Sequence, residues 1–99
     1  MLKKRFFKTK NECEVTFELD TDDAGQADLV CDVNGWKPIR MKKAPKGPFR
    51  AKLRFPKDES FEFRYLVDKS RWINDADADD YRANGLGDAN GVLDTATRG

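Results

Sequence analysis

The feature that most constrains the fold is an alternation of apolar and polar side chains, with a period of two residues, along most of the chain. In residues 14–20, Val15, Phe17 and Leu19 fall on one side, and acidic side chains with Thr16 fall on the other. Successive side chains of a β-strand point to opposite faces, so this segment predicts a half-buried strand. Helical periodicity is absent, and the whole chain is predicted to be all-β.

The same alternation recurs between turns rich in glycine, proline, asparagine and aspartate. The predicted strands are residues 14–20, 27–33, 39–42, 49–55, 61–68, 71–73 and 91–94. A long polar loop, residues 74–90, precedes the last strand. About seven short strands at this spacing are typical of an antiparallel β-sandwich.

The length of 99 residues predicts a single domain, with a basic lead-in at residues 1–10 and a ragged tail at 95–99. The lead-in lacks the apolar region of a signal peptide, and no stretch approaches the ~20 apolar residues of a membrane helix. We therefore expect a cytoplasmic protein in which Cys13 and Cys31 are free thiols. A disulfide stays open as an alternative if Val15 pairs near Cys31 across a hairpin.

The formal net charge is +1, from 19 basic and 18 acidic side chains. Such a balance gives no field that would attract nucleic acid or an anionic membrane, so we expect neither as a partner. Neutral sugars suit this surface better. The basic N-terminal residues are interpreted as a solvated lead-in, with Phe6 or Phe7 docked on the core.

The residue types argue against catalysis. The chain has no histidine, so neither cysteine has the usual activating base, and the acidic residues fall mainly on predicted solvated faces. Residues 74–80 resemble the start of a calcium loop, but Asp80 and Leu86 stand where glycine and glutamate are required. We expect no enzyme, no cofactor and no metal, and an Asx-rich loop that caps its own amides.

Two tryptophans fall outside the alternating core pattern. Trp36 follows an Asn-Gly turn, and Trp72 follows the turn at residues 68–70. Sugar rings present flat C–H faces that exposed aromatic rings cover well, although either tryptophan could instead cap an end of the core. Arg64 lies on the outward side of its strand, where its donors suit sugar hydroxyls; a solvated sheet-face arginine is the alternative.

Six stretches together carry a family resemblance. They are residues 7–19, 29–36, 61–68, 72–75, 78–87 and 90–93. In order and spacing they resemble the family-48 carbohydrate-binding modules, the isoamylase-type early-set domains. The glycogen-binding domain of AMP-activated protein kinase β subunits is of this type, and small stand-alone bacterial proteins of the group look similar to the opening of this chain.

The resemblance implies an immunoglobulin-like sandwich with an α-glucan site on one face. Trp36 and Trp72 occupy the positions of two tryptophans that stack on glucose rings. Arg64 stands in place of a lysine that hydrogen-bonds sugar hydroxyls. Leu86 matches a leucine that packs against the glucan, and Asn90 matches an asparagine that hydrogen-bonds it.

The chain departs from the family at several points. Asp88 replaces a threonine two residues before the asparagine, and residues 31–36 read Cys-Asp-Val-Asn-Gly-Trp where members often have Gly-Asp-Phe-Asn-x-Trp. The hairpin between Val67 and Trp72 is one residue longer than in the kinase domain.

Two functions follow as predictions. The first is non-catalytic binding of α-1,4-glucan, such as glycogen, starch or maltooligosaccharide. The alternative is a protein-interaction domain without sugar affinity, which docks on a glycogen-metabolising enzyme of the glycoside hydrolase family 13 type through exposed strand edges.

Overall fold

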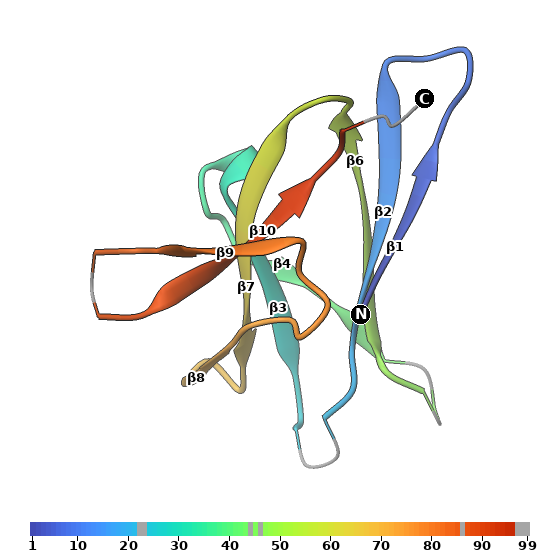
Figure 1. Ribbon diagram of the computed structural model, residues 1–99. Helices are drawn as coiled ribbons and strands as arrows, with labels where there is room; N and C mark the ends of the chain where they lie inside the picture. The colour runs from blue at the N-terminus through green and yellow to red at the C-terminus, as the bar shows by residue number, and fades with distance from the viewer. Residues whose placement is uncertain (22–23, 44, 46, 86, 97–99) are drawn as a thin grey trace.

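Two antiparallel β-sheets face each other across one core (Figure 1). The computed structural model describes residues 1–21, 24–43, 45, 47–85 and 87–96, and within these ranges there is no α-helix. The first sheet has the order β1-β2-β6-β5, with β1 at Leu2–Phe6, β2 at Glu12–Leu19, β6 at Phe49–Pro56 and β5 at Lys42–Lys43. The predicted all-β sandwich is confirmed.

The second sheet has the order β4-β3-β7-β10-β9, and β8 pairs with the C-terminal end of β7, at residues 65–67, beyond the residues that pair with β10. Its strands are β4 at Ile39–Arg40, β3 at Ala27–Cys31, β7 at Ser60–Val67, β10 at Ala89–Asp94, β9 at Asp80–Ala83 and β8 at Arg71–Ile73. A short 3-10 helix, η1 at Asp32–Asn34, follows β3. No helix among the described residues has the length and apolar character needed to cross a membrane.

Aromatic rings from both sheets meet in the core. Phe17 of β2 lies edge-on to Phe63 of β7, with ring centres 5.3 Å apart. Phe55 of β6 meets Phe61 of β7 at 4.8 Å. Tilted and edge-to-face pairs at these distances are favourable beyond the area they bury. The inward residues of the alternating segments therefore form the core that the sequence predicts.

The predicted loop at residues 74–90 holds an unpredicted strand. Within it, β9 pairs with β10, which begins at Ala89 rather than at Gly91. All four residues of β9 are exposed, so the strand has no apolar face that alternation could reveal. The loop before it behaves as predicted for an Asx-rich segment, because Asp75 Oδ1 accepts the backbone N–H of Asp77 at 2.8 Å.

Asp75 also anchors this loop to the core. It is 4% exposed, and its Oδ2 accepts the hydroxyl of buried Tyr65 at 2.7 Å. The amino group of Met1 lies 2.7 Å from the same oxygen. Burial raises the pKa of Tyr65, and the hydrogen bond to Asp75 adds to the effect. Tyr65 therefore stays a neutral donor that holds the segment leaving β8.

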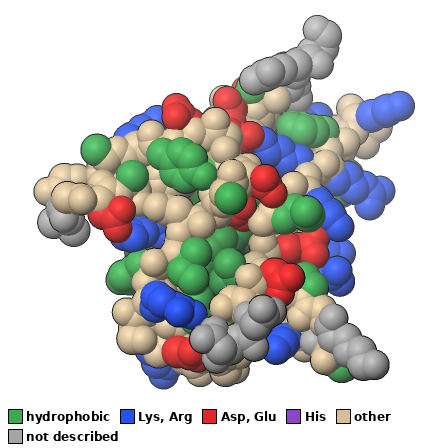
Figure 2. Space-filling model, turned by 60° about the horizontal axis from the view of Figure 1, so that its bottom comes forward, with side chains coloured by type: hydrophobic (Ala, Val, Ile, Leu, Met, Phe, Trp, Pro, Cys, Tyr) green, Lys and Arg blue, Asp and Glu red, His purple; other side chains and the backbone are tan. Residues whose placement is uncertain are grey.

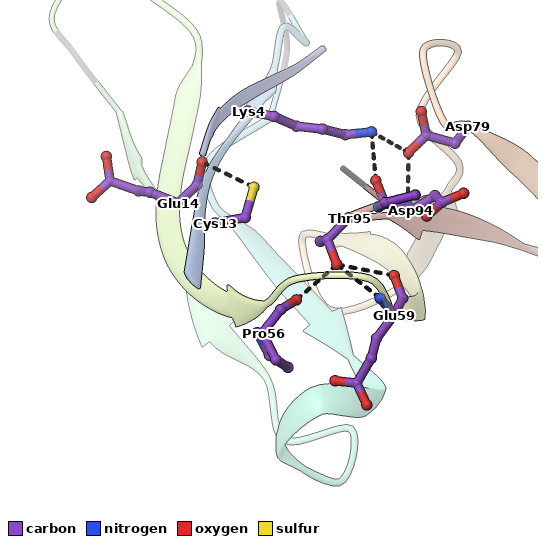
Figure 3. Close-up of polar contacts among 9 residues, drawn as sticks. Lys4, Cys13, Glu14, Pro56, Glu59, Asp79, Asp94 and Thr95 are labelled. Atoms are coloured by element: carbon purple, nitrogen blue, oxygen red, sulfur yellow. Dashed lines mark hydrogen bonds and ion pairs between the residues drawn. The ribbon is translucent and has the colours of Figure 1, made fainter. Parts of the chain in front are cut away.

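The lead-in prediction is wrong for residues 2–6, which form β1 at the edge of the first sheet. Lys4 lies opposite Val15 and reaches across the sandwich, where its Nζ contacts Asp79 Oδ2 at 2.5 Å and the carbonyl of Asp94 at 2.8 Å (Figure 3). Phe7 does not dock on the core as predicted. Its ring lies between the guanidinium groups of Arg5 and Arg54, at 5.3 and 5.0 Å.

The prediction of a ragged tail is wrong for Thr95. Thr95 is fully buried, and its hydroxyl lies 2.7 Å from the carbonyl of Pro56 and accepts the N–H of Glu59 at 3.1 Å (Figure 3). This side chain ties the end of β10 to the turn between β6 and β7.

The predicted strand at residues 39–42 is two strands in different sheets. Met41, which is 3% exposed, sits between β4 and β5 and donates its N–H to the carbonyl of Ala27 at 2.9 Å. The chain thus crosses from the second sheet to the first at one buried residue.

The two cysteines are free and buried, as predicted. The hairpin on which the disulfide alternative depended does not form. Cys13 pairs with Phe6 and Phe55 in the first sheet, and Cys31 pairs with Phe63 in the second.

Candidate functional site

Trp72 sits in the middle of β8, where the register places it beside Leu66 on the outer face of the second sheet. The turn before it is fixed by its own backbone and by one side chain. Asp68 and Lys69 both have positive φ, at 51° and 57°, and Asp68 Oδ1 accepts the N–H groups of Gly25 and Gln26. The indole is 48% exposed, so the alternative in which Trp72 caps the core is wrong.

Arg64 lies on the same outer face, paired across the ladder with Val30 of β3. Its guanidinium carbon is 5.2 Å from the centre of the Trp72 ring, and its Nη2 donates to Asp88 Oδ2 at 2.7 Å. The side chain is 13% exposed, so it is not the solvated arginine of the alternative prediction. Its buried Nε finds no acceptor in the part of the chain that the structure describes. Stacking and the ion pair hold the guanidinium in one place.

Asp88 is the anchor that the sequence did not predict. The N–H of Ala89 donates to Oδ1 at 2.8 Å, and this bond, followed by the charge of Arg64, lowers the pKa of Asp88. The resemblance places a threonine at this position. In this chain a carboxylate occupies it and binds the arginine.

Asn90 lies in β10 beside Glu62 of β7. Its Nδ2 donates to Glu62 Oε1 at 3.1 Å, and Arg82 of β9 donates to Glu62 Oε2 at 3.3 Å. Val92 pairs with Glu62, so Asn90, two residues earlier, falls at the level of Arg64. The structure thus brings Trp72, Arg64 and Asn90 to one face.

Asn74 is a further polar residue that the site prediction left out. It stands two residues after Trp72, and its Nδ2 donates to the carbonyl of Ala89 at 2.9 Å. Its Oδ1 is buried and has no donor among the described residues. Side chains two residues apart in a strand share a face, which was the signal in the sequence.

Trp36 follows η1 and is 40% exposed, so it does not cap the core either. The backbone N–H of Trp36 donates to the carbonyl of Cys31 at 3.1 Å. Asn34 fixes the loop, because its side chain exchanges two hydrogen bonds with the backbone of Lys37. No ring contact or ion pair between described residues joins Trp36 to Arg64 or Trp72. Leu86, the fifth predicted site residue, lies outside the described residues.

The two tryptophans lie apart along the second sheet. Figure 1 shows η1 at the upper end of β3 and β8 beside the lower end of β7. Cys31, which holds the Trp36 backbone, pairs with Phe63, whereas Trp72 pairs with Leu66. Three residues of strand separate these levels, or about 10 Å. The candidate site is therefore elongated along β7.

This face offers an exposed indole, an immobilised guanidinium and two side-chain amides. Comparison with protein-family models finds no match for the chain, and comparison with curated proteins finds none either.

Proposed function

We propose that the protein is a non-catalytic module that binds α-1,4-glucan chains such as glycogen, starch or maltooligosaccharides. The observation that carries the proposal is the pair of Trp72 and Arg64. An indole that is 48% exposed stands on a paired strand, with a guanidinium held 5.2 Å from its ring centre. A rigid aromatic surface beside fixed donors suits a sugar ring, which has a flat C–H face and a rim of hydroxyls.

The separation of the two tryptophans supports binding of a chain of sugars rather than of a single sugar ring. Trp36 and Trp72 are both exposed, and Cys31, which holds the Trp36 backbone, lies about 10 Å along the sheet from the level of Trp72. In this proposal the two indoles stack on different glucose units, while Arg64 and Asn90 bind hydroxyls between them and Leu86 contributes an apolar contact. The immunoglobulin-like early-set fold and a cytoplasmic location belong to the same proposal.

The test is an NMR titration of labelled protein with maltoheptaose that follows the indole N–H signals of Trp36 and Trp72. We expect both signals to shift saturably, with a Kd of about 10 μM to 1 mM. Trp72→Ala is expected to weaken binding about tenfold, because a stacked ring is worth about 1–1.5 kcal/mol. Cellohexaose, a β-linked glucan, is the control ligand for linkage and is expected to bind more weakly than maltoheptaose or maltohexaose.

Absence of any shift at millimolar maltoheptaose would contradict glucan binding. The protein-interaction alternative would then be the working hypothesis, tested by co-purification with a glycogen-metabolising enzyme. Equal shifts with cellohexaose would retain sugar binding and remove the preference for α-linked glucan.

A further inference from the structure

A cavity lies away from the glucan face, where the chain crosses between the sheets. It has a volume of about 570 Å³ and is bordered by β4, β5 and β6. Cavities of 300–1,000 Å³ are typical of small-molecule sites. Ile39 and Ala51 give it an apolar part.

The charged residues that line this cavity are all cationic. They are Arg40, Lys42, Lys43, Arg50 and Lys52. Among the described lining residues there is no carboxylate, although the whole chain carries a net charge of only +1. Figure 2 shows that lysine and arginine side chains gather along the side of the molecule that carries the first sheet. A cavity lined in this way favours an anion.

The two arginines are held by carboxylates that lie outside the cavity lining. Arg40 Nε donates to Asp28 Oδ1 at 2.8 Å, and Arg50 Nε donates to Glu18 Oε2 at 3.1 Å. Asp28 and Glu18 are 6% and 8% exposed, and each is the cross-strand partner of the arginine that it fixes. Both bonds use Nε, which leaves the paired Nη nitrogens of each guanidinium for the planar, two-point contact that phosphate oxygens favour.

The lysines differ in their surroundings. The Nζ of Lys43 lies 5.5 Å from the Phe49 ring centre, and Lys43 also borders a smaller cavity that contains Asp20. For Lys42 and Lys52, the ion pairs formed within the described ranges include no carboxylate partner. These two lysines are therefore the cations whose charge is least compensated.

We propose that this cavity binds a small phosphorylated molecule with an apolar body. The phosphoryl group binds the Nη groups of Arg40 and Arg50 and the ammonium groups of Lys42 and Lys52, and the apolar body rests on Ile39 and Ala51. The volume of this partly open cavity suits a molecule of this size better than an extended acidic peptide, which would use the strand edge and not the cavity.

Phenyl phosphate is the probe, because it joins a phosphoryl group to an apolar ring. Titration is followed by the backbone amide signals of Ala51 and Lys52 in the full chain. We expect saturable shifts, weaker binding of inorganic phosphate and none of phenol. Lys42→Ala and Lys52→Ala are each expected to raise the Kd about threefold to tenfold. Lys10→Ala removes the same charge outside the cavity lining and is expected to leave the Kd unchanged.

Several outcomes would overturn the proposal. These are absence of shifts at Ala51, equal binding of phenyl phosphate and inorganic phosphate, and an equal loss of affinity in Lys10→Ala. Tighter binding of a hexaglutamate peptide than of phenyl phosphate would assign the surface to an acidic peptide. Trp72→Ala is expected to leave phenyl phosphate binding intact, so this test and the glucan test fail independently.

Discussion

The outer faces of the two sheets are covered by different kinds of side chain. On the first sheet, the outward residues of β2 are mostly acidic and those of β6 are basic, and the register places them opposite one another. Glu18 accepts Arg50 at 3.1 Å and lies 2.9 Å from Lys3, while Glu12 accepts Arg54. Arg50 and Arg54 are more than half exposed. The outer face of the first sheet is therefore covered by paired acidic and basic side chains.

The outer face of the second sheet contains apolar side chains instead. Val30 and Val92 alternate with core residues and so point outward, yet they are 4% and 5% exposed. Val30 pairs directly with Arg64, whose side chain is 13% exposed. The second outer face thus combines an exposed aromatic ring with a partly dry surface, and the glucan proposal depends on this difference between the two faces.

The largest expected contrast is between Val30→Ala and Lys52→Ala. Val30→Ala removes buried methyl groups and is expected to lower the free energy of unfolding by about 1.5 kcal/mol. Lys52→Ala alters an exposed side chain and is expected to change it by less than about 0.5 kcal/mol. Urea denaturation measures both. Equal effects would show that the second outer face is no drier than the first.

Arg64→Ala and Arg54→Ala form the next pair. Both arginines stack on an aromatic ring and bind a carboxylate, but Arg64 is 13% exposed and Arg54 is 54% exposed. We expect the free energy of unfolding to fall by about 1 kcal/mol in Arg64→Ala and by about 0.3 kcal/mol in Arg54→Ala. Maltoheptaose affinity should fall only in Arg64→Ala. A similar fall in Arg54→Ala would assign the sugar site to the outer face of the first sheet instead.

Glu18 is the least exposed acid of the charged face, and its stability contribution should depend on pH. The hydrogen bonds from Lys3 and Arg50 lower its pKa below the ordinary value of 4.5. Stabilisation by the carboxylate is therefore complete above pH 4.5 and is lost as the pH falls through the lowered pKa. Glu18→Gln is expected to lower the free energy of unfolding by about 1 kcal/mol or less at pH 7. The difference from the unaltered protein should disappear in acid; a difference independent of pH would contradict this account.

Asp88→Asn is expected to have the smallest effect. Asp88 holds Arg64 beside Trp72 through a charged hydrogen bond. The amide is a weaker acceptor and would hold the guanidinium less firmly, so maltoheptaose affinity is expected to fall about twofold to threefold. Calorimetric titration measures the change. A rise in affinity would show instead that Asp88 competes with the sugar for Arg64.

The sequence predicted the parts of the fold in which burial alternates. Core strands such as β2, β6 and β7 alternate because each has one face in the core and one in water. Alternation could not find β9, which is exposed on every residue, or separate β4 from β5, because the switch of sheets occupies only Met41. In β1, a lysine takes an inward position, so its composition concealed a strand.

The candidate site was predictable to the same extent. Alternation placed Arg64 on the outward side of its strand, as the register confirms, but it did not place Trp72 on the same face. The pairing of Arg64 with Asp88 depends on the path of a loop, which alternation does not describe. The same is true of the basic cavity, since its residues come from three strands of two sheets.

Lys4 has a consequence for the behaviour of the molecule among its own copies. It projects inward from β1, the outermost strand of the first sheet, and is tied there to Asp79 and Asp94. An outermost strand exposes unpaired backbone groups that recruit further strands, and an inward-pointing charged side chain on such a strand is one of the features that disfavour edge-to-edge pairing. The side chain that closes the sandwich therefore also guards the protein against aggregation along this edge.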